Sequence, residues 1–529
     1  MTIIFNMKLK LAAVLAFSAL ILAACSSNDA GNADEAKGNQ KKTEEQVAQV
    51  DGLQTTNAET LTGNKFTITA KEAKHQLNSK VTVDAWTFNG SVPGSQIRVM
   101  EGEKVKITFK NELPVPSSIH WHGITVPNEM DGIPGVTQNA VQPGESFTYE
   151  FTPTIPGTYM YHTHQDAVNQ MDMGLYGTII VEPKEKTYDR DYTLMFDEWI
   201  SDSQKSNMPM NDMGEMDHSG MNHGGGSAAP DNSHGSQDMG HDMSIYDIYT
   251  INGKSGDAIE PLKVKEGEKV RLRLVNPGYL SHNIHLHGHD IKVVAVDGQD
   301  VNEPKEVKDQ LISIAPGERY DIEFTANNPG EWYLEEHGNT EGTKGMKALI
   351  QYEGNNETKD QSNQNKKLPI FSYINYGGTK TGKFTLDQEY DVEYTMDLNG
   401  NNDDNVWTIN GKAFPETVGL NIKKGDLVKV KLINNSPTGV NHPMHLHGHS
   451  FQVLSKNGQP VEGSPIIKDT ISLESGDEYV VAFEADNSGN WLFHCHDLHH
   501  ATAGMVDVIK YDGYQPNFTP DPNSNNKPE

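Results

Sequence analysis

Trp86-Thr87-Phe88-Asn89-Gly90, Tyr249-Thr250-Ile251-Asn252-Gly253 and Trp407-Thr408-Ile409-Asn410-Gly411 are three versions of one five-residue phrase. Each is followed by a segment in which apolar and polar residues alternate. These segments lie at 105–109, 270–274 and 428–432. Alternation with a period of two indicates a strand with one buried face. Repetition of the same pattern along the chain indicates three copies of one structural unit.

The repeat continues with a His-x-His-Gly motif in every copy, at 120–123, 285–288 and 445–448. No long amphipathic helical pattern interrupts it. Short strands with regular turn signals are typical of β-sandwiches with Greek-key connections. We therefore predict an all-β protein of three consecutive sandwich domains. Their expected ranges are 61–185, 186–355 and 366–512, with a disordered tail at 513–529.

The N-terminal segment has the pattern of a bacterial lipoprotein signal. Lys8 and Lys10 precede an apolar stretch at 11–24, which is typical of a secretory signal peptide over residues 1–24. Cys25 follows small residues and is the expected site of lipidation. Residues 25–60 contain few large apolar groups and are predicted to be a disordered tether. An uncleaved membrane anchor is the alternative, but the apolar run is shorter than the roughly 20 residues that a span needs. The prediction is a lipid-anchored, extracytoplasmic protein.

Charge and cysteine content exclude other classes. The 529 residues carry a formal net charge of −30, which argues against nucleic-acid binding. Cys25 and Cys495 are the two cysteines. If Cys25 is lipidated and Cys495 binds metal, no disulfide forms, and a sizeable core and bound metal must supply the stability.

Residues 494–505 read His-Cys-His-Asp-Leu-His-His-Ala-Thr-Ala-Gly-Met. A thiolate, nearby imidazoles and a thioether are most of a blue-copper electron-transfer site, and the run at 442–447 can supply the missing histidine. Successive side chains of a strand point to opposite faces. Cys495 can therefore bind one metal while His494 and His496 point toward a second cluster, which an electron would reach through covalent bonds.

Comparison of the copies shows where such a site can form. Thr163 and Glu336 replace Cys495 in the first and second copies. In the middle copy, Met346 matches Met505, but Glu341 stands where the third copy has His500. We interpret the remaining histidines of the middle copy as structural, with a hard-metal site using Glu335 or Glu336 as the alternative. These histidines are His282, His285, His287 and His337.

Four motifs stand together, at 120–123, 162–164, 442–447 and 494–505. In order and spacing they resemble the multicopper oxidase family, in its three-domain branch of laccase-like and cuprous oxidases. The resemblance covers about residues 60–512 and implies cupredoxin-like domains and four copper ions. It implies a type 1 copper held by His442, Cys495, His500 and Met505, and a type 2 copper held by His120 and His445. It implies a type 3 pair held by His122, His162, His164, His447, His494 and His496.

The resemblance also suggests a route for protons. Asp131 matches the position of an acid beside the trinuclear site, although a turn residue before glycine needs no further role. Several bacterial relatives have a glutamate after the histidine at 500, whereas this chain has Ala501. Asp497 or solvent is expected to replace that glutamate.

A segment rich in methionine and histidine lies at 201–243 within the middle copy. It contains Met208, Met210, Met213, Met216, Met221, Met239, Met243, His218, His223, His234 and His241. Thioether sulfur prefers Cu(I), so this composition favours copper capture over a loop without special chemistry.

The function that this resemblance implies is oxidation of Cu(I) coupled to reduction of O₂ to water, with a role in copper tolerance. A laccase-like oxidase of phenols or other small reductants is the alternative. A copper-sequestering protein is an alternative of another class. A copper nitrite reductase fits less well, because it has no need for eight trinuclear histidines.

Overall fold

The computed structural model describes residues 53–201, 245–338, 342–355, 357, 367–401 and 405–528. The chain divides into residues 1–50 and 51–529, and all described residues belong to the second unit. The predicted signal peptide and Cys25 therefore lie outside the described residues. Within the described part, no helix is long and apolar enough to cross a membrane.

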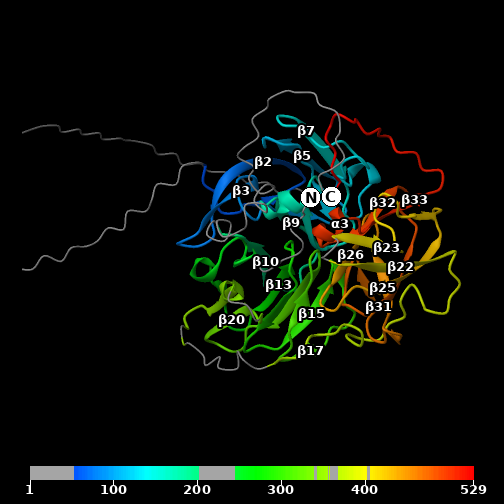
Figure 1. The fold of residues 1–529 in the computed structure, drawn as a ribbon. Coiled ribbons are helices and arrows are strands. Elements are labelled where there is room, and N and C mark those ends of the chain that lie inside the picture. The colour runs from blue at the N-terminus through cyan, green and yellow to red at the C-terminus, as the bar shows by residue number, and fades with distance from the viewer. Residues whose placement is uncertain are drawn as a thin grey trace, which may run out of the picture. The chain divides into compact units, whose positions relative to one another are not determined.

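The first domain consists of two sheets with one core between them (Figure 1). One sheet has the strand order β1-β4-β9-β8-β6 and the other β3-β2-β5-β7. The strands are β1 (Thr60–Thr62), β2 (Lys65–Gln76), β3 (Thr82–Phe88), β4 (Gln96–Met100), β5 (Val105–Asn111), β6 (His120–His122), β7 (Ser146–Phe151), β8 (Gly157–His162) and β9 (Tyr176–Glu182).

The second domain repeats this order with β11-β10-β13-β19-β15-β16, where β17 also pairs with β15, and β12-β21-β20-β14-β18. Its strands are β10 (Arg190–Trp199), β11 (Ile248–Ile251), β12 (Leu262–Val264), β13 (Lys269–Val275), β14 (His282–Leu286), β15 (Ile291–Val296), β16 (Gln299–Asp300), β17 (Glu306–Val307), β18 (Ile312–Ile314), β19 (Arg319–Thr325), β20 (Glu331–Glu336) and β21 (Lys347–Tyr352).

The third domain has the same order again, β23-β22-β25-β31-β27-β28, where β29 also pairs with β27, and β24-β33-β32-β26-β30. Its strands are β22 (Val392–Asn401), β23 (Val406–Ile409), β24 (Leu420–Ile422), β25 (Leu427–Asn434), β26 (His442–Leu446), β27 (Phe451–Lys456), β28 (Gln459–Pro460), β29 (Ile466–Lys468), β30 (Thr470–Leu473), β31 (Glu478–Glu484), β32 (Asn490–Cys495) and β33 (Val506–Tyr511). The predicted all-β architecture of three repeated domains is confirmed.

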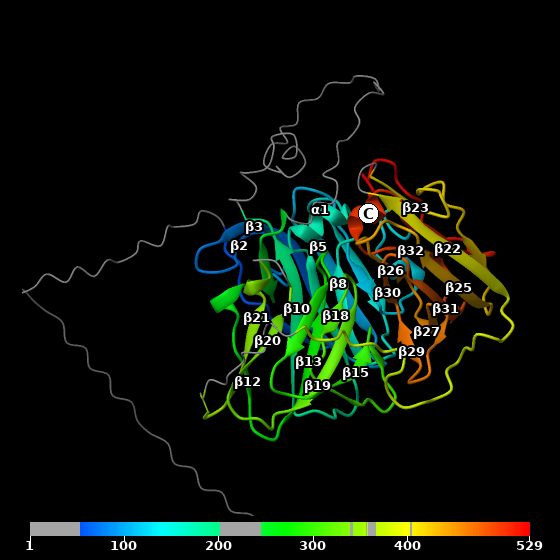
Figure 2. The ribbon, with the colours of Figure 1, turned by 60° about the horizontal axis from the view of Figure 1, so that its bottom comes forward.

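Helices are few and short among the described residues. They are α1 (Ala167–Asp172), α3 (Leu498–Thr502) and the 3₁₀ turns η1 (Asn128–Met130), η4 (Gly256–Ala258) and η5 (Gly342–Gly345). Helices α1 and α3 contact each other, although they come from the first and third domains. Helix α3 also contacts β32, and Figure 2 shows α1 at the upper edge of the ribbon, above the label of β5.

The Asn-Gly pair of the repeated phrase has a structural reason. Both residues adopt positive φ in every copy, for example 60° at Asn89 and 79° at Gly90. Two successive residues with positive φ form the tight turn that matches the twist of paired strands. The turn closes with a backbone bridge in each copy, such as that between Phe88 and Ser91. The phrase is thus the end of a strand (β3, β11 or β23) and the tight turn that follows it in each unit.

The glycine of His-x-His-Gly is needed for the same kind of reason. Gly288 and Gly448 have φ of 72° and 68°, in the left-handed region that favours glycine. A Cβ atom would also lie 2.4 Å from the Trp332 ring at the first position and 2.5 Å from the Trp491 ring at the second. The chain therefore turns sharply after the two histidines and passes closely against a tryptophan.

Both ends of the described chain differ from the predictions of disorder. Thr55 N donates to Lys74 O over 2.9 Å, so the fold begins before residue 61. The predicted disordered tail at 513–529 is wrong for the stretch that follows Asp521, which hydrogen-bonds to the first domain. Gln165 Nε2 donates to Asn525 O over 2.8 Å, and Ala140 N donates to Asn526 Oδ1 over 2.8 Å. Backbone groups, which composition does not reveal, make most of these contacts.

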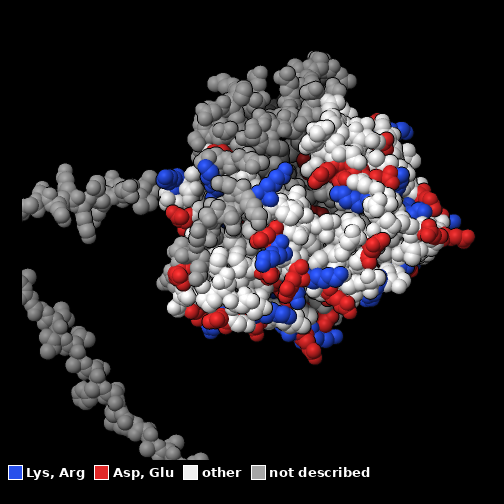
Figure 3. Space-filling model, turned by 90° about the horizontal axis from the view of Figure 1, so that it is seen from below, with Lys and Arg blue, Asp and Glu red and all other residues white. Residues whose placement is uncertain are grey.

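Acidic and basic side chains are interspersed on the face that Figure 3 shows. Many are paired across neighbouring strands, as Lys431 is with Glu478 at 2.6 Å. Such exposed pairs stabilise a fold only weakly.

Candidate metal centres

Strands β26 and β32 place Cys495 and its neighbours on opposite sides of one sheet. Their register pairs Met444 with Cys495 and His445 with His494. Cys495 belongs to the apolar core of the third domain together with Met505. His494 faces the other way, with its Nε2 atom 3.0 Å from Nε2 of His447. The alternation expected from the sequence is present.

On the core side, three donor atoms form a small triangle. Cys495 Sγ lies 3.7 Å from His442 Nδ1 and 3.5 Å from His500 Nδ1, and the two nitrogens are 3.2 Å apart. All three residues are buried. One thiolate and two imidazole nitrogens in this arrangement match the trigonal ligand set of a blue-copper site.

Neighbouring groups fix the orientation of these imidazoles. Ser436 Oγ lies 2.8 Å from His442 Nε2, which leaves Nδ1 toward the sulfur. The ring of Trp407 lies 3.8 Å from the ring of His500, measured between centroids. Met505 is fully buried, and its backbone N–H bonds the His500 carbonyl over 2.9 Å. Such contacts hold ligands in place before metal binds.

On the other side, eight histidines from the first and third domains gather in one buried cluster. His120 stacks on His447 at 4.1 Å, and His122 stacks on His445 at 3.7 Å. Ligand nitrogens lie within 4.8 Å of one another in three groups. These groups are His120 with His445 and His447, His120 with His122 and His162, and His164 with His447 and His494. His496 completes the cluster, with its ring 4.8 Å from that of His122.

The ring nitrogens themselves indicate that this cluster is built for metal. The buried Nε2 atoms of His120, His162 and His445 have no hydrogen-bond partner among the described residues. In the first two residues, Nδ1 donates to a backbone carbonyl over 2.8 Å. An unpaired buried polar atom costs about 1–3 kcal/mol. A shared centre of metal ions would use these lone pairs, whereas apolar packing would not.

Burial also keeps the cluster in the form that binds metal. It lowers the pKa of His162, His447 and His494 well below the ordinary value, and neighbouring histidines lower it further. The same causes lower the pKa of His496 to about 3. Neutral imidazole is the ligand form, so these rings are ready to bind copper near neutral pH.

Two carboxylates hold histidines of the cluster. Asp131 Oδ2 lies 3.0 Å from His447 Nδ1, and the Asp131 backbone carbonyl accepts from His120. Asp469, which the sequence did not single out, lies 3.1 Å from His122 Nε2 and binds Arg319 through two hydrogen bonds. Burial alone would raise the pKa of Asp469, but the Arg319 guanidinium holds it well below its usual range. The sequence feature that could have pointed to Asp469 is the charged pair Lys468-Asp469, which directly precedes an apolar strand.

Asp497 lies beside the other centre. Its carboxylate caps α3 by accepting from His499 N over 3.1 Å, and it lies 3.5 Å from His500 Nδ1. Ala501 is buried with Leu492 and Val506. Asp497 thus contacts a histidine of the thiolate centre, and its role in place of the glutamate stays a prediction.

The middle copy has carboxylates where the third has ligands. Glu336 Oε2 lies 3.6 Å from His282 Nδ1, and Glu198 lies 3.6 Å from Nε2 of the same ring. Among the described residues no thiol occurs there, although the buried Met346 matches Met505 and its carbonyl accepts from Glu336 N over 3.1 Å. His285, His287 and His337 form a separate group on the β14–β20 pair.

The methionines and histidines of 202–243 lie outside the described residues, but the residues at both ends of this segment are described. Ile200 and Tyr246 pack in one apolar cluster with Leu498 of α3. Leu498 is two residues from His500. The described residues on either side of this segment therefore pack near the thiolate centre, a placement that the sequence left open.

The C-terminal tail hydrogen-bonds a histidine of the cluster. His164 Nδ1 donates to the carbonyl of Pro528. We expect removal of residues 515–529 to weaken copper retention by about 10–100-fold, since losing an outer partner of a metal ligand has effects of that size. Dialysis against a graded series of chelator concentrations measures it. Lys527→Ala is the control, because it keeps the backbone contacts and removes only the contact between Lys527 Nζ and Asp166 at 3.6 Å. Equal retention by the truncated and full chains would contradict this role.

Comparison with protein families matches three domain models described as multicopper oxidase, over residues 69–186, 190–356 and 388–513. The chain belongs to the multicopper oxidase family. It is therefore a copper-dependent oxidoreductase, as the resemblance in its motifs implied.

Relatives and a solved structure agree with this assignment. Multicopper oxidase MmcO of Mycobacterium tuberculosis is 32% identical over 460 residues, which are 84% of this chain and 86% of the relative. Copper resistance protein A of Escherichia coli is 24% identical over 86% of this chain and 94% of its own length. The crystal structure of a multicopper oxidase from Pseudomonas thermotolerans has a TM-score of 0.62 at 25% identity, covering 86% of this chain and all of that one. Relatives named laccase also match.

Proposed function

We propose that this multicopper oxidase oxidises Cu(I) and reduces O₂ to water, with a role in copper tolerance. The observation that carries the proposal is the position of Cys495. Its sulfur belongs to the thiolate centre, while the adjacent His494 and His496 belong to the cluster of eight histidines. When bound, copper would supply the one-electron steps that together deliver four electrons to O₂.

The proposed ligands follow the two groups. His442, Cys495 and His500, with Met505 as a weak axial donor, would hold a type 1 copper. His120 and His445 would hold a type 2 copper. A type 3 pair would be held by His122, His162, His164, His447, His494 and His496. Each of the outer domains contributes four of these eight histidines, so neither domain alone can hold the cluster.

The chain itself provides the electron route. The backbone from Cys495 to either neighbouring histidine is continuous, and His494 Nδ1 donates to the Cys495 carbonyl over 2.9 Å. Substrate oxidation and O₂ reduction can therefore take place at separate sites joined by a covalent link. Asp131 and Asp469 would orient ligands of the second site, and Asp131 remains the proposed proton donor there.

Three observations support Cu(I) as the electron donor. The segment with seven methionines is anchored at both ends beside Leu498, close to His500. Thioethers favour Cu(I) over harder ions. A relative carries the name copper resistance protein A. Phenol oxidation is the second candidate, because relatives named laccase also match.

Deletion of residues 202–244 tests the electron donor. We expect the rate of O₂ consumption with Cu(I) to fall at least about tenfold, because the soft ligands for Cu(I) are lost. Consumption with a phenolic donor should stay within about twofold, because none of the proposed type 1, type 2 and type 3 ligands is removed. The matched control replaces the segment with a Gly/Ser linker of equal length. An equal loss of O₂ consumption with both donors would contradict the assignment of Cu(I) as electron donor. An unchanged rate with Cu(I) would favour the hypothesis of a laccase-like oxidase.

We further propose that Cys25 anchors the enzyme by a lipid outside the cytoplasmic membrane. The basis is the sequence pattern at 8–25. We expect Cys25→Ser to move most of the enzyme from the membrane fraction to the soluble fraction without changing its specific activity, since the variant lacks the lipidated thiol. Fractionation followed by O₂ uptake measures both quantities. Retention of the variant in the membrane fraction would contradict the lipid anchor.

A further inference from the structure

The middle domain repeats half of the histidine cluster on the same strand pair. Strands β14 and β20 pair His285 with Glu335, just as β6 and β8 pair His120 with His162, and β26 and β32 pair His445 with His494. The backbone contact of the next histidine is repeated as well. His287 N donates to Tyr333 O over 2.9 Å, as His447 N donates to Leu492 O over 3.0 Å.

The side chains converge as a ligand set would. His285, His287 and His337 each place one ring nitrogen within 4.8 Å of the others. His287 Nε2 lies 2.9 Å from Glu335 Oε1 and 3.4 Å from His337 Nε2. Glu335 Oε1 is also 3.9 Å from His337 Nε2. Three imidazoles and one carboxylate oxygen thus surround one point.

Neighbouring groups hold Glu335 in position. Lys347 Nζ contacts the other carboxylate oxygen, Oε2, at 2.9 Å and leaves Oε1 toward the histidines. Burial alone would raise the pKa of Glu335, but His287 and Lys347 lower it to about 2. Burial and the neighbouring histidines lower the pKa of His285 to about 4, so its ring is neutral near pH 7. The set presents an anionic oxygen and at least one neutral imidazole.

One atom of the set lacks the bonds that a purely structural cluster would make. His285 Nδ1 is buried and has no hydrogen-bond partner among the described residues. If hydrogen bonds alone held the cluster together, the free-energy cost of burying this unpaired nitrogen would remain. His337 is only partly buried at the end of β20, which leaves a path for an ion to enter.

We propose that His285, His287, Glu335 and His337 bind a fifth metal ion, a divalent transition-metal ion such as Cu(II) or Zn(II). Imidazole ligands with one carboxylate suit both ions, and Cu(II) is the more strongly bound in the general order of affinities. In the outer domains two such half-sites face each other and share several ions. The middle domain supplies a single half-site with a carboxylate in place of one histidine, which suits a single ion.

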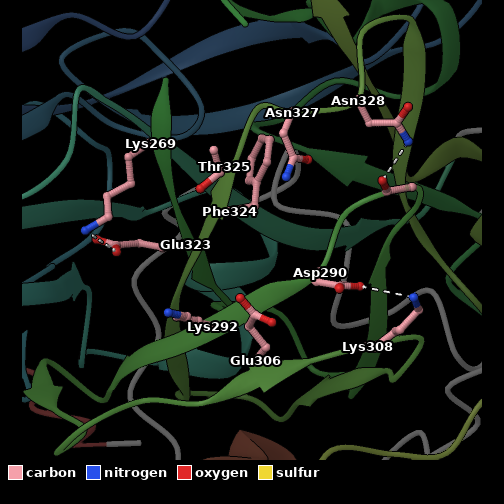
Figure 4. Close-up of a pocket in the computed structure, with 11 residues that line it drawn as sticks. Lys269, Asp290, Lys292, Glu306, Lys308, Glu323, Phe324, Thr325, Asn327 and Asn328 are labelled. Atoms are coloured by element: carbon pink, nitrogen blue, oxygen red, sulfur yellow. Dashed lines mark hydrogen bonds and ion pairs between the residues drawn. The ribbon is translucent and has the colours of Figure 1, made fainter. Parts of the chain in front are cut away.

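A nearby hollow on the same domain differs from this site. It is lined by Lys269, Asp290, Lys308, Glu323 and neighbouring residues (Figure 4). Lys269 lies 3.3 Å from Glu323, and Lys308 lies 3.9 Å from Asp290. Two of its charged pairs are thus matched within the protein, and no histidine is among its lining residues.

The test counts metal ions on the copper-loaded full chain. The enzyme and its His285→Gln/His337→Gln variant are dialysed against Zn(II) or, separately, Cu(II), washed, and measured by elemental analysis. We expect the variant to retain one ion fewer per chain. Ions held by the methionine-rich segment cancel in this difference. His289→Gln is the matched control, because neither ring nitrogen of His289 faces the proposed ion: Nε2 contacts Tyr352 Oη at 2.6 Å, and Nδ1 contacts the backbone carbonyl of His287 at 3.0 Å. This variant should keep the extra ion.

The two metals and a second variant make the outcome decisive. A difference with Cu(II) or Zn(II) identifies the ion, and added Cu(II) should give an electron paramagnetic resonance signal with nitrogen couplings that the double variant lacks. His337→Gln alone, which alters the least buried ligand, replaces the double variant if that protein loses its blue absorption. Equal ion counts in the wild type and a variant that keeps its blue absorption would overturn the proposal. This site stands independently of the Cu(I) assignment.

Discussion

We expect Cys495→Ser to abolish oxidase turnover and the blue absorption band, and to lower the copper content by one ion per chain. The hydroxyl that replaces the thiol is a hard donor that does not supply the soft charge-transfer ligand of a blue-copper site. The same change removes the sulfur from which electrons pass to His494 and His496. The eight histidines are untouched, so the cluster between the first and third domains should remain loaded. Absorption near the blue band, O₂ uptake and elemental analysis measure the three effects on one sample.

Met505→Leu is the control that separates loss of the Cys495 thiolate from general disruption of the packing around it. Met505 is fully buried in the same core, and leucine conserves most of its volume. The variant should keep the blue band and the copper content of the wild type, with a changed reduction potential, because the axial ligand tunes that potential. Turnover by Cys495→Ser with Cu(I) at a rate near that of the wild type would show that electrons enter elsewhere.

Asp469→Asn should weaken copper retention or turnover by about 10–100-fold, the usual effect of losing an outer partner of a metal ligand. Asp469 Oδ1 contacts His122 Nε2 at 3.1 Å and accepts from Arg319 Nη1 at 2.7 Å. Asparagine removes the charge that orients the histidine. Among the described residues, it also leaves the fully buried Arg319 with Asp297 at 3.6 Å as its remaining charged partner. Breaking a buried pair costs about 3–5 kcal/mol, so stability should fall as well.

Asp321→Asn is the matched control for that loss of stability. Asp321 Oδ2 accepts from Arg273 Nη1 over 2.9 Å in another buried pair, whose partners are not histidines of the cluster. Chemical denaturation should show comparable losses for both variants, whereas copper retention should fall only for Asp469→Asn. If both variants lose copper equally, the contribution of Asp469 is structural rather than specific to the ligand.

The threefold fold could be predicted because its signals are local. Asn-Gly turns, alternating strands and the glycine after each histidine pair depend on φ angles and on one buried face, which neighbouring residues determine. The types of candidate metal ligand could be predicted from the sequence for the same reason. Side chains alternate between the two faces of a strand. Cys495 must therefore point away from its neighbours His494 and His496, however the domains pack.

Other features depend on residues hundreds of positions apart. Asp469 reaches His122, and Pro528 reaches His164, through folding of the whole chain. Asp497 is a predicted replacement for the glutamate that several relatives have after the histidine at 500, and folding places its carboxylate 3.5 Å from His500 Nδ1. The tail at 513–529 is predicted to be disordered, yet its backbone groups find partners on the first domain.

The sequence by itself determined the family, the three β-sandwich units and the set of residues able to bind copper, because donor chemistry and strand periodicity are properties of short segments. Only the tertiary structure decided which acids hold those ligands, where the methionine-rich segment is anchored, and that the middle copy gathers three histidines around Glu335. Those arrangements depend on packing between domains and on the distances it sets between side chains far apart in the chain.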